Sequence, residues 1–190
     1  MVVISCTLSG FKEVHINQTN TLLTDRGTTS FLKFGRAVQD VQVAKRTYKG
    51  SGFTIVIPEN WKVKRLDDTR TMFVGPKIGN SHFAFFVTRI GREGKNYLDA
   101  AKATKGQQAN YTNYTILEGK DISQEGFSAY SRRSSWFAED IDMVLFVREI
   151  FTQSSSHVFI LSASIPNTPH MTDLDKLAVS ILNSFRFDQE

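Results

Sequence analysis

The sequence contains little cysteine and little proline, and it has no long apolar run. Its 190 residues include one Cys and four Pro. Because Cys6 is alone, an intramolecular disulfide and a zinc site built from several cysteines are both excluded. No stretch approaches the roughly 18 apolar residues that a membrane-spanning helix needs. We therefore expect a domain held together by an apolar core, without a disulfide or a membrane span.

The chain also lacks a strong excess, or a block, of one charge. Lys and Arg number 23 against 19 Asp and Glu, which leaves a net charge of +4. The basic residues are scattered, and no run reaches the length typical of a polyanion-binding tail. Hydrophobic residues make up 41% and aromatic residues 12% of the chain, enough for a core without a metal. We therefore expect no nucleic-acid partner.

The first part of the chain differs in composition from the rest. Residues 17–30 are polar and rich in Thr and Asn, as linkers are. The apolar spacing in residues 31–43 suits a short amphipathic helix, and the alternation at its end suits a strand equally well. We predict an N-terminal extension or linker over residues 1–47 and one domain over residues 48–190.

Three strands and a helix are predicted in the first half of that domain. Runs of β-branched and aromatic residues predict strands at residues 52–58, 71–74 and 82–90. Residues 96–109 are rich in alanine and predict a helix, for which Asn96 is a suitable N-cap.

Four strands and a second helix are predicted in the other half. The strands are expected at residues 114–117, 127–133, 143–152 and 157–165. A short polar loop joins the last two, which is typical of a hairpin. The final helix is expected to be capped by Thr172 or Asp173. Hairpin spacing without a repeating βαβ unit predicts an α+β fold, in which an antiparallel β-sheet is flanked by helices.

A spaced set of residues resembles a known family over residues 48–188. The set consists of Gly52-Phe53-x-Ile55-x-x-Pro58-x-x-Trp61, Gly75-Pro76, Gly126-Phe127-x-Ala129-Tyr130 and Ser184-Phe185-Arg186. In this order the chain resembles the PsbP-like superfamily, and most closely its bacterial DcrB-like members. The resemblance implies an α/β/α sandwich around an antiparallel sheet. It also implies a non-enzymatic accessory role, as in photosystem subunits, assembly factors, envelope lipoproteins, a Ran-binding factor and secretion chaperones.

An acidic cluster and a glycine pair are weak candidates for ligand sites. Glu139, Asp140 and Asp142 could hold a metal ion, but they lack the glycine and distal glutamate of an EF-hand. A solvated turn is the favoured interpretation. Gly50-Ser51-Gly52 precedes a predicted strand instead of following one and opening a helix, so it does not indicate a dinucleotide site. We expect no cofactor.

An enzyme is a further alternative, and it would require residues distant in the sequence to meet in one pocket. All four histidines lie at the ends of predicted elements, and no His-x-x-x-His or His-Glu-x-x-His pattern occurs. A hydrolase or a metal-dependent enzyme would need a pocket that gathers two or more of His82, His157, Glu139 and Asp142. We expect no catalytic residues.

Aromatic and basic residues lie together near the end of one predicted strand. Arg132 and Arg133 point to opposite faces of that strand, which disfavours binding of single-stranded nucleic acid. Trp136 and Phe137 follow in what we predict to be a polar loop. These four residues are our candidates for contact with a protein partner. Ordinary packing of Trp136 in the core is the alternative.

The segment Val3-Ile4-Ser5-Cys6 matches a bacterial lipobox, in which the cysteine carries the lipid. A signal peptide also needs a basic region and an apolar stretch, and the sequence before Cys6 is too short to hold them. If the start is truncated, Cys6 is a lipidation candidate and the protein belongs to the bacterial cell envelope. Otherwise Cys6 is an ordinary small apolar residue and the protein is cytoplasmic.

Three functional hypotheses follow. The first is a non-enzymatic, protein-binding accessory domain associated with the envelope, with residues 75–81 and 134–142 as its contact loops. The alternative is a cytosolic chaperone of the same fold for a secreted or membrane client, which requires an exposed apolar groove. The second alternative is the enzyme considered above.

Overall fold

The computed structural model describes residues 44–123 and 127–188. The elements within these residues are ten β-strands, two α-helices and a 3-10 turn. They are β1 (Lys45–Lys49), β2 (Phe53–Pro58), β3 (Lys62–Arg65), β4 (Arg70–Ile78), β5 (Ser81–Gly91), α1 (Tyr97–Gln108), β6 (Thr115–Asp121), β7 (Ala129–Ala138), η1 (Glu139–Ile141), β8 (Met143–Gln153), β9 (His157–Pro166), α2 (Met171–Asn183) and β10 (Arg186–Phe187).

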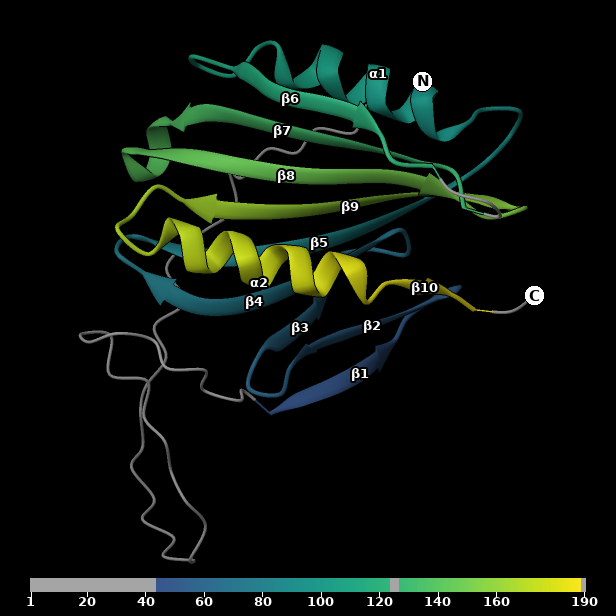
Figure 1. The fold of residues 1–190 in the computed structure, drawn as a ribbon, viewed down its shortest axis with the longest axis horizontal. Helices are drawn as coiled ribbons and strands as arrows, with labels where there is room; N and C mark the ends of the chain where they lie inside the picture. Colours follow the sequence, from purple (N-terminus) through teal and green to yellow (C-terminus); the bar gives the residue numbers. More distant parts are fainter. Residues whose placement is uncertain (1–43, 124–126, 189–190) are drawn as a thin grey trace, which may run out of the picture. The chain divides into compact units, whose positions relative to one another are not determined.

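The strands form two antiparallel sheets (Figure 1). The larger has seven strands in the order β3-β4-β5-β9-β8-β7-β6, and the smaller has three in the order β1-β2-β10. Helix α1 covers β7, β8 and β9, while α2 packs on β9 and β2. Adjacent residues of β9 face different layers: Ile160 packs with α1, whereas Phe159 and Leu161 pack with α2 and the small sheet. The predicted α+β fold is confirmed.

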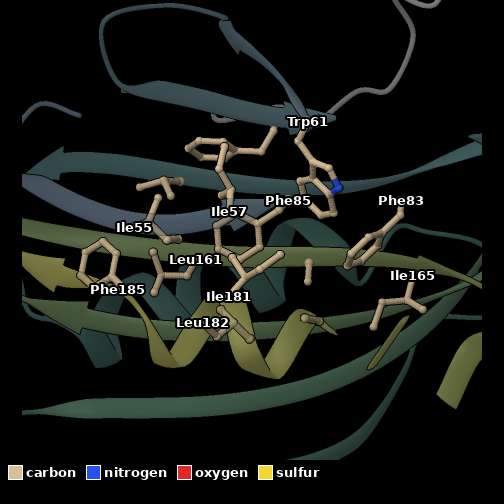
Figure 2. Packing of buried hydrophobic residues seen from close by; sticks show 14 of the residues in the cluster. Ile55, Ile57, Trp61, Phe83, Phe85, Leu161, Ile165, Ile181, Leu182 and Phe185 are labelled. Carbon is tan, nitrogen blue, oxygen red and sulfur yellow. The ribbon is translucent and has the colours of Figure 1, made fainter. Parts of the chain in front are cut away.

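The main core lies between the large sheet and the layer formed by α2 and β2 (Figure 2). Strand β2 alternates, so that Phe53, Ile55 and Ile57 are buried. The inward face of α2 carries Leu174 and Ile181 at helical spacing. These residues account for the apolar spacing that predicted both elements.

The glycine of the Gly75-Pro76 pair allows Trp61 to pack in this core. The Trp61 ring lies edge-on to Phe83, with their centroids 5.1 Å apart. A β-carbon on Gly75 would lie 2.8 Å from Trp61 Cζ2 and 3.0 Å from the backbone oxygen of Phe83. No side chain fits there without displacing the indole, so the glycine serves close packing.

The two helices begin differently. Asn96 caps α1 as predicted: its Oδ1 accepts hydrogen bonds from the backbone N–H of Leu98 at 2.8 Å and of Asp99 at 3.0 Å. The Asp99 carboxylate accepts the Asn96 N–H in return, which completes a capping box. The second predicted helix is present, but the predicted cap was wrong. That helix begins at Met171, before Thr172, and His170 occupies the N-cap position without a side-chain cap bond.

Several elements were missed or misjudged at the edges of the sheets. Strands β1, β3 and β10 were not predicted, because they are short and polar and bury few side chains. Strand β4 continues past Gly75-Pro76 through an irregularity between Val74 and Lys77. Lys45 of β1 pairs with Pro58 of β2, so strand pairing begins before residue 48, where the domain boundary was expected. The division into residues 1–47 and 48–190 stays a prediction.

Asp67 closes the hairpin between β3 and β4. Its Oδ1 accepts the backbone N–H groups of Thr69 and Arg70, both at 2.8 Å, and its Oδ2 accepts Arg70 Nε at 2.8 Å. The hydrogen bond from the Thr69 hydroxyl, together with those from Arg70, holds the pKa of the Asp67 carboxyl well below its usual range.

We expect Asp67→Ala to lower the free energy of unfolding at neutral pH by on the order of 1 kcal/mol. The pKa of Asp67 in the folded chain lies below its value in the unfolded chain, which is about 3.9. The ionised carboxylate therefore stabilises the fold fully above that pH, and this stabilisation is lost as the pH falls. The deficit of the variant should therefore shrink below about pH 4. Urea unfolding over a pH series measures it. Asp67→Asn keeps an oxygen acceptor and should therefore lose less stability. A deficit of Asp67→Ala that does not change with pH would contradict the role of the ionised carboxylate.

Candidate partner-binding site

The four residues predicted to contact a partner divide between the two faces of β7. This strand pairs with β8 through Ala138, so Trp136 and Phe137 lie within a strand and not in a loop. The loop prediction was wrong because pairing with β8 continues through the polar residues Ser134 and Ser135 to Ala138. Arg132 and Trp136 point towards α1, whereas Arg133 and Phe137 point towards the α2 side.

Arg132 is not available to a partner, which corrects the sequence-based prediction. Only 2% of its surface is exposed. Its Nε donates to Glu149 Oε2 at 2.8 Å, its Nη1 to the Ala101 carbonyl at 2.9 Å, and its Nη2 to Gln108 Oε1 at 2.9 Å. Its guanidinium also lies 4.9 Å from the Phe151 ring centroid. Arg132 therefore fastens α1 to the sheet.

Glu149 is the buried counter-charge and was missed at the sequence level. Burial raises the pKa of the Glu149 carboxyl, and the positive charge of Arg132 opposes that rise. Gln108 Nε2 donates to Glu149 Oε1 at 3.0 Å, and the Tyr114 hydroxyl donates to Gln108 Oε1 at 3.1 Å. The available signal was a charged residue at position 149, on the strand face that otherwise carries the apolar Leu145, Val147 and Phe151.

Trp136 is half-buried and packs beside Tyr111, with ring centroids 5.0 Å apart. The adjacent N–H of Phe137 donates to the Thr112 carbonyl at 2.8 Å. Trp136 thus lies against the segment between α1 and β6. This contact supports the packing interpretation for Trp136, and part of the indole remains exposed.

A small groove lies on the opposite face, beside the first turns of α2. Its volume is about 110 Å³. Strands β6 and β7 contribute Leu117 and Arg133, and α2 contributes Met171 on the other side. The remaining lining residues are Ser134, Phe146, Val147, Arg148, Ile165, Thr172 and Asp175. Phe137 lies on the same face as Phe146, because it pairs with Val144 two residues earlier in β8.

The charges around this groove are paired. Arg148 makes a two-pronged contact with Asp175 of α2, with Nε–Oδ1 at 3.0 Å and Nη2–Oδ2 at 2.8 Å. Arg133 is 36% exposed and lies 3.9 Å from Glu118, measured from Nη1 to Oε2. The groove combines an apolar floor with a rim of paired charges, which is the arrangement of many protein interfaces.

The acidic cluster lies in the η1 turn. Glu139 Oε1 accepts the Thr112 hydroxyl at 2.6 Å, and Asp142 has a left-handed backbone with φ of 50°. Within residues 44–123 and 127–188, no three His, Cys, Asp or Glu side chains gather in a way that could hold a metal ion. The interpretation as a turn is consistent with these contacts.

His82 and His157 lie far apart. His82 is in the second position of β5, and His157 pairs with Gly91 at the other end of that strand, about 30 Å away. The ring Nδ1 of His82 is 3.2 Å from the Gly75 carbonyl oxygen, and His157 Nδ1 is 2.7 Å from the Ser156 hydroxyl. These two histidines cannot share a catalytic pocket.

The two contact loops predicted from the sequence meet at one end of the large sheet (Figure 1). Most of residues 75–81 and 134–142 belong to strands, which leaves short turns between β4 and β5 and between β7 and β8. A β-carbon on Gly79 would lie 3.6 Å from Met143 Cε, so the turns are neighbours. The side chain of Met143, the first residue of β8, therefore approaches the β4–β5 turn.

Cys6 and the lipobox lie outside the described residues. Among the residues described, none of the helices has the length and apolar character required to cross a bilayer.

Comparison with known proteins identifies the fold. No protein-family model matches the sequence, and no curated protein matches it. Among solved structures, cyanobacterial PsbP (CyanoP) from Synechocystis sp. PCC 6803 has a TM-score of 0.57 and 9% identity, covering 82% of this chain and 99% of that one. The domain has the PsbP-like fold. LpqN, involved in cell envelope biogenesis of Mycobacterium tuberculosis, has a TM-score of 0.56 and 14% identity. The match covers 79% of this chain and 94% of LpqN. At these identities the likeness extends to the fold alone.

Proposed function

We propose that this PsbP-like domain is a non-enzymatic accessory protein that binds another protein at the bacterial envelope. The observation that carries the proposal is the groove beside α2, where an apolar floor is bordered by Arg133 and by the Arg148–Asp175 pair. The fold likeness to LpqN, a protein of cell envelope biogenesis, supports the location. The DcrB-like resemblance of the sequence supports the same setting.

The size of the groove favours an anchoring side chain over a bound helix. A volume of about 110 Å³ suits one large apolar side chain of a partner. An α-helix with its side chains is about 10 Å wide and needs a long trough. The proposal therefore favours a partner that inserts an aliphatic or aromatic residue next to Arg133, instead of the helix-binding chaperone.

Photo-cross-linking in the native host tests the groove. In the first variant a photo-reactive benzophenone amino acid replaces Thr172, the exposed second residue of α2, which lines the groove. In the matched control the same amino acid replaces Leu98, the exposed second residue of α1, which lies over the opposite face of the large sheet. We expect a discrete adduct with one envelope protein from position 172 and none from position 98.

The charge at the rim provides a second arm of this test. Arg133→Glu should weaken the adduct from position 172 by about tenfold, as loss of one interface arginine does. Lys102→Glu, an exposed change on α1, should leave it unchanged. Equal adducts from both positions, or an adduct insensitive to Arg133, would reject the groove as the binding site.

The envelope location has its own measurement. Intact mass spectrometry of the protein from its native host should find a diacylglyceryl group on Cys6 and no residues before it. An unmodified Met1 would reject the lipid tether and turn attention to the cytosolic alternative.

A further inference from the structure

Strand β6 forms one edge of the seven-stranded sheet and is exposed along its whole length. All seven residues from Thr115 to Asp121 are exposed. They include Leu117, which is 49% exposed, next to Ile116 at 36%. An edge strand of this kind presents unpaired N–H and C=O groups to another chain.

The hydrogen-bond pattern determines which backbone groups of β6 face outward. The N–H of Ile122 donates to the Ala129 carbonyl at 2.9 Å, one step beyond the Asp121–Tyr130 pair. Because hydrogen-bonded pairs alternate along antiparallel strands, Lys120 bonds to β7, whereas Gly119 directs its N–H and C=O away from the sheet. Gly119 therefore lies at the centre of an edge that no other described strand covers.

The charges on either side of Gly119 are of opposite sign and share one face. Lys120 Nζ lies 3.3 Å from Glu118 Oε1. If a second copy pairs antiparallel about Gly119, each Glu118 lies opposite Lys120 of the other copy. Those residues form the non-hydrogen-bonded pairs, in which side chains approach most closely. The edge is therefore complementary to itself in charge.

Two other edge strands, β3 and β1, carry charges of one sign only and would therefore repel their own copies. The charged residues of β3 are Lys62, Lys64 and Arg65, and those of β1 are Lys45, Arg46 and Lys49. Pairing either edge with its own copy would place cations against cations, a known protection against self-association. The mixed charge of β6 distinguishes it from both.

We propose that two copies of this chain associate through antiparallel pairing of their β6 strands about Gly119, which joins the two large sheets. The irregularity between Ile116 and Glu118 limits the pairing at one end and makes the contact short. The inference does not rest on partner binding at the α2 groove.

Sedimentation equilibrium of the full chain, from micromolar to millimolar concentration, tests the proposal through a charge swap. Wild type is expected to form a dimer. Lys120→Glu should raise the dissociation constant at least about tenfold, because it places Glu against Glu twice in each dimer. Glu118→Lys combined with Lys120→Glu should restore the affinity. These side chains are exposed, so the variants should fold normally, which circular dichroism verifies.

Amide hydrogen exchange locates the contact. The Gly119 N–H should gain protection as the concentration rises, while the Lys120 N–H, already bonded to β7, should not change. A chain that stays monomeric, a dimer insensitive to Lys120→Glu, a double variant as weak as the single one, or a dimer without added protection at Gly119 would each overturn the proposal.

Discussion

Arg132→Met is expected to lower the free energy of unfolding by about 3–5 kcal/mol, because it leaves the Glu149 carboxylate buried without its cation. Both side chains are only 2% exposed, and the guanidinium makes three hydrogen bonds beneath α1. Urea unfolding followed by circular dichroism measures the change from the transition midpoint. Arg133→Met, on the opposite and partly exposed face of the same strand, is the matched control and should cost less than about 1 kcal/mol.

A double variant separates the buried charge from simple loss of packing. Replacing both Arg132 and Glu149 by Met should recover much of the stability, because a buried ion pair replaced by apolar residues of similar volume is often nearly neutral. If the double variant is less stable than Arg132→Met alone, the deficit arises from the hydrogen bonds to Ala101 and Gln108 and not from an unpaired charge.

The deficit of Arg132→Met should also depend on pH. Burial already raises the pKa of Glu149, and removal of the arginine removes the main influence that lowers it. A carboxyl with a raised folded pKa binds its proton more tightly in the folded chain, so stability falls as the pH rises above the unfolded value near about 4.3. The difference between variant and wild type should therefore grow from pH 4 towards neutrality. A constant difference would show that Arg132 does not influence the pKa of Glu149 in the folded chain.

Phe185→Ala is expected to lower the free energy of unfolding by about 3–5 kcal/mol, the usual result of removing a buried aromatic side chain. Its ring stacks on Phe53 with centroids 5.7 Å apart, and it lies 5.4 Å from both Phe159 and Phe187. The residue joins the end of α2 to the small sheet and the large sheet, and Figure 2 shows it among the side chains of all three layers.

Phe187→Ala provides the comparison for this prediction. Phe187 belongs to the same aromatic group but is only partly buried, so its removal should cost less than about 2 kcal/mol. Thermal or urea unfolding of the two variants measures the difference. Equal losses would show that the site collapses around the missing ring and that burial does not control the energetics here.

Several of the residues that carried the family resemblance are packing residues of the described fold. Phe53 and Trp61 are buried, Gly75 makes room for the indole, and Phe185 closes the core. Ser184 Oγ accepts the backbone N–H of Val56 at 2.9 Å and ties α2 to the small sheet. These residues could predict the fold because they are its packing contacts. For the same reason they carried no information about a ligand.

Local patterns sufficed wherever an element buries one face. Strands β2 and β9, both helices and the Asn96 cap followed from periodicity and capping chemistry, which depend on residues close in sequence. The short polar edges β1 and β3 left no such pattern. Their formation depends on hydrogen bonds to a neighbouring strand, so the sequence around them did not indicate it.

By itself, the sequence determined the α+β class, most of the element order, and the fact that Arg132 and Arg133 point to opposite faces of one strand. Only the tertiary structure decided which of the two meets solvent, because that depends on the side of the sheet that α1 covers. It likewise brought Leu117, Phe146 and Met171, distant along the chain, to one groove. Strand alternation is a local property, whereas burial of each face results from long-range packing.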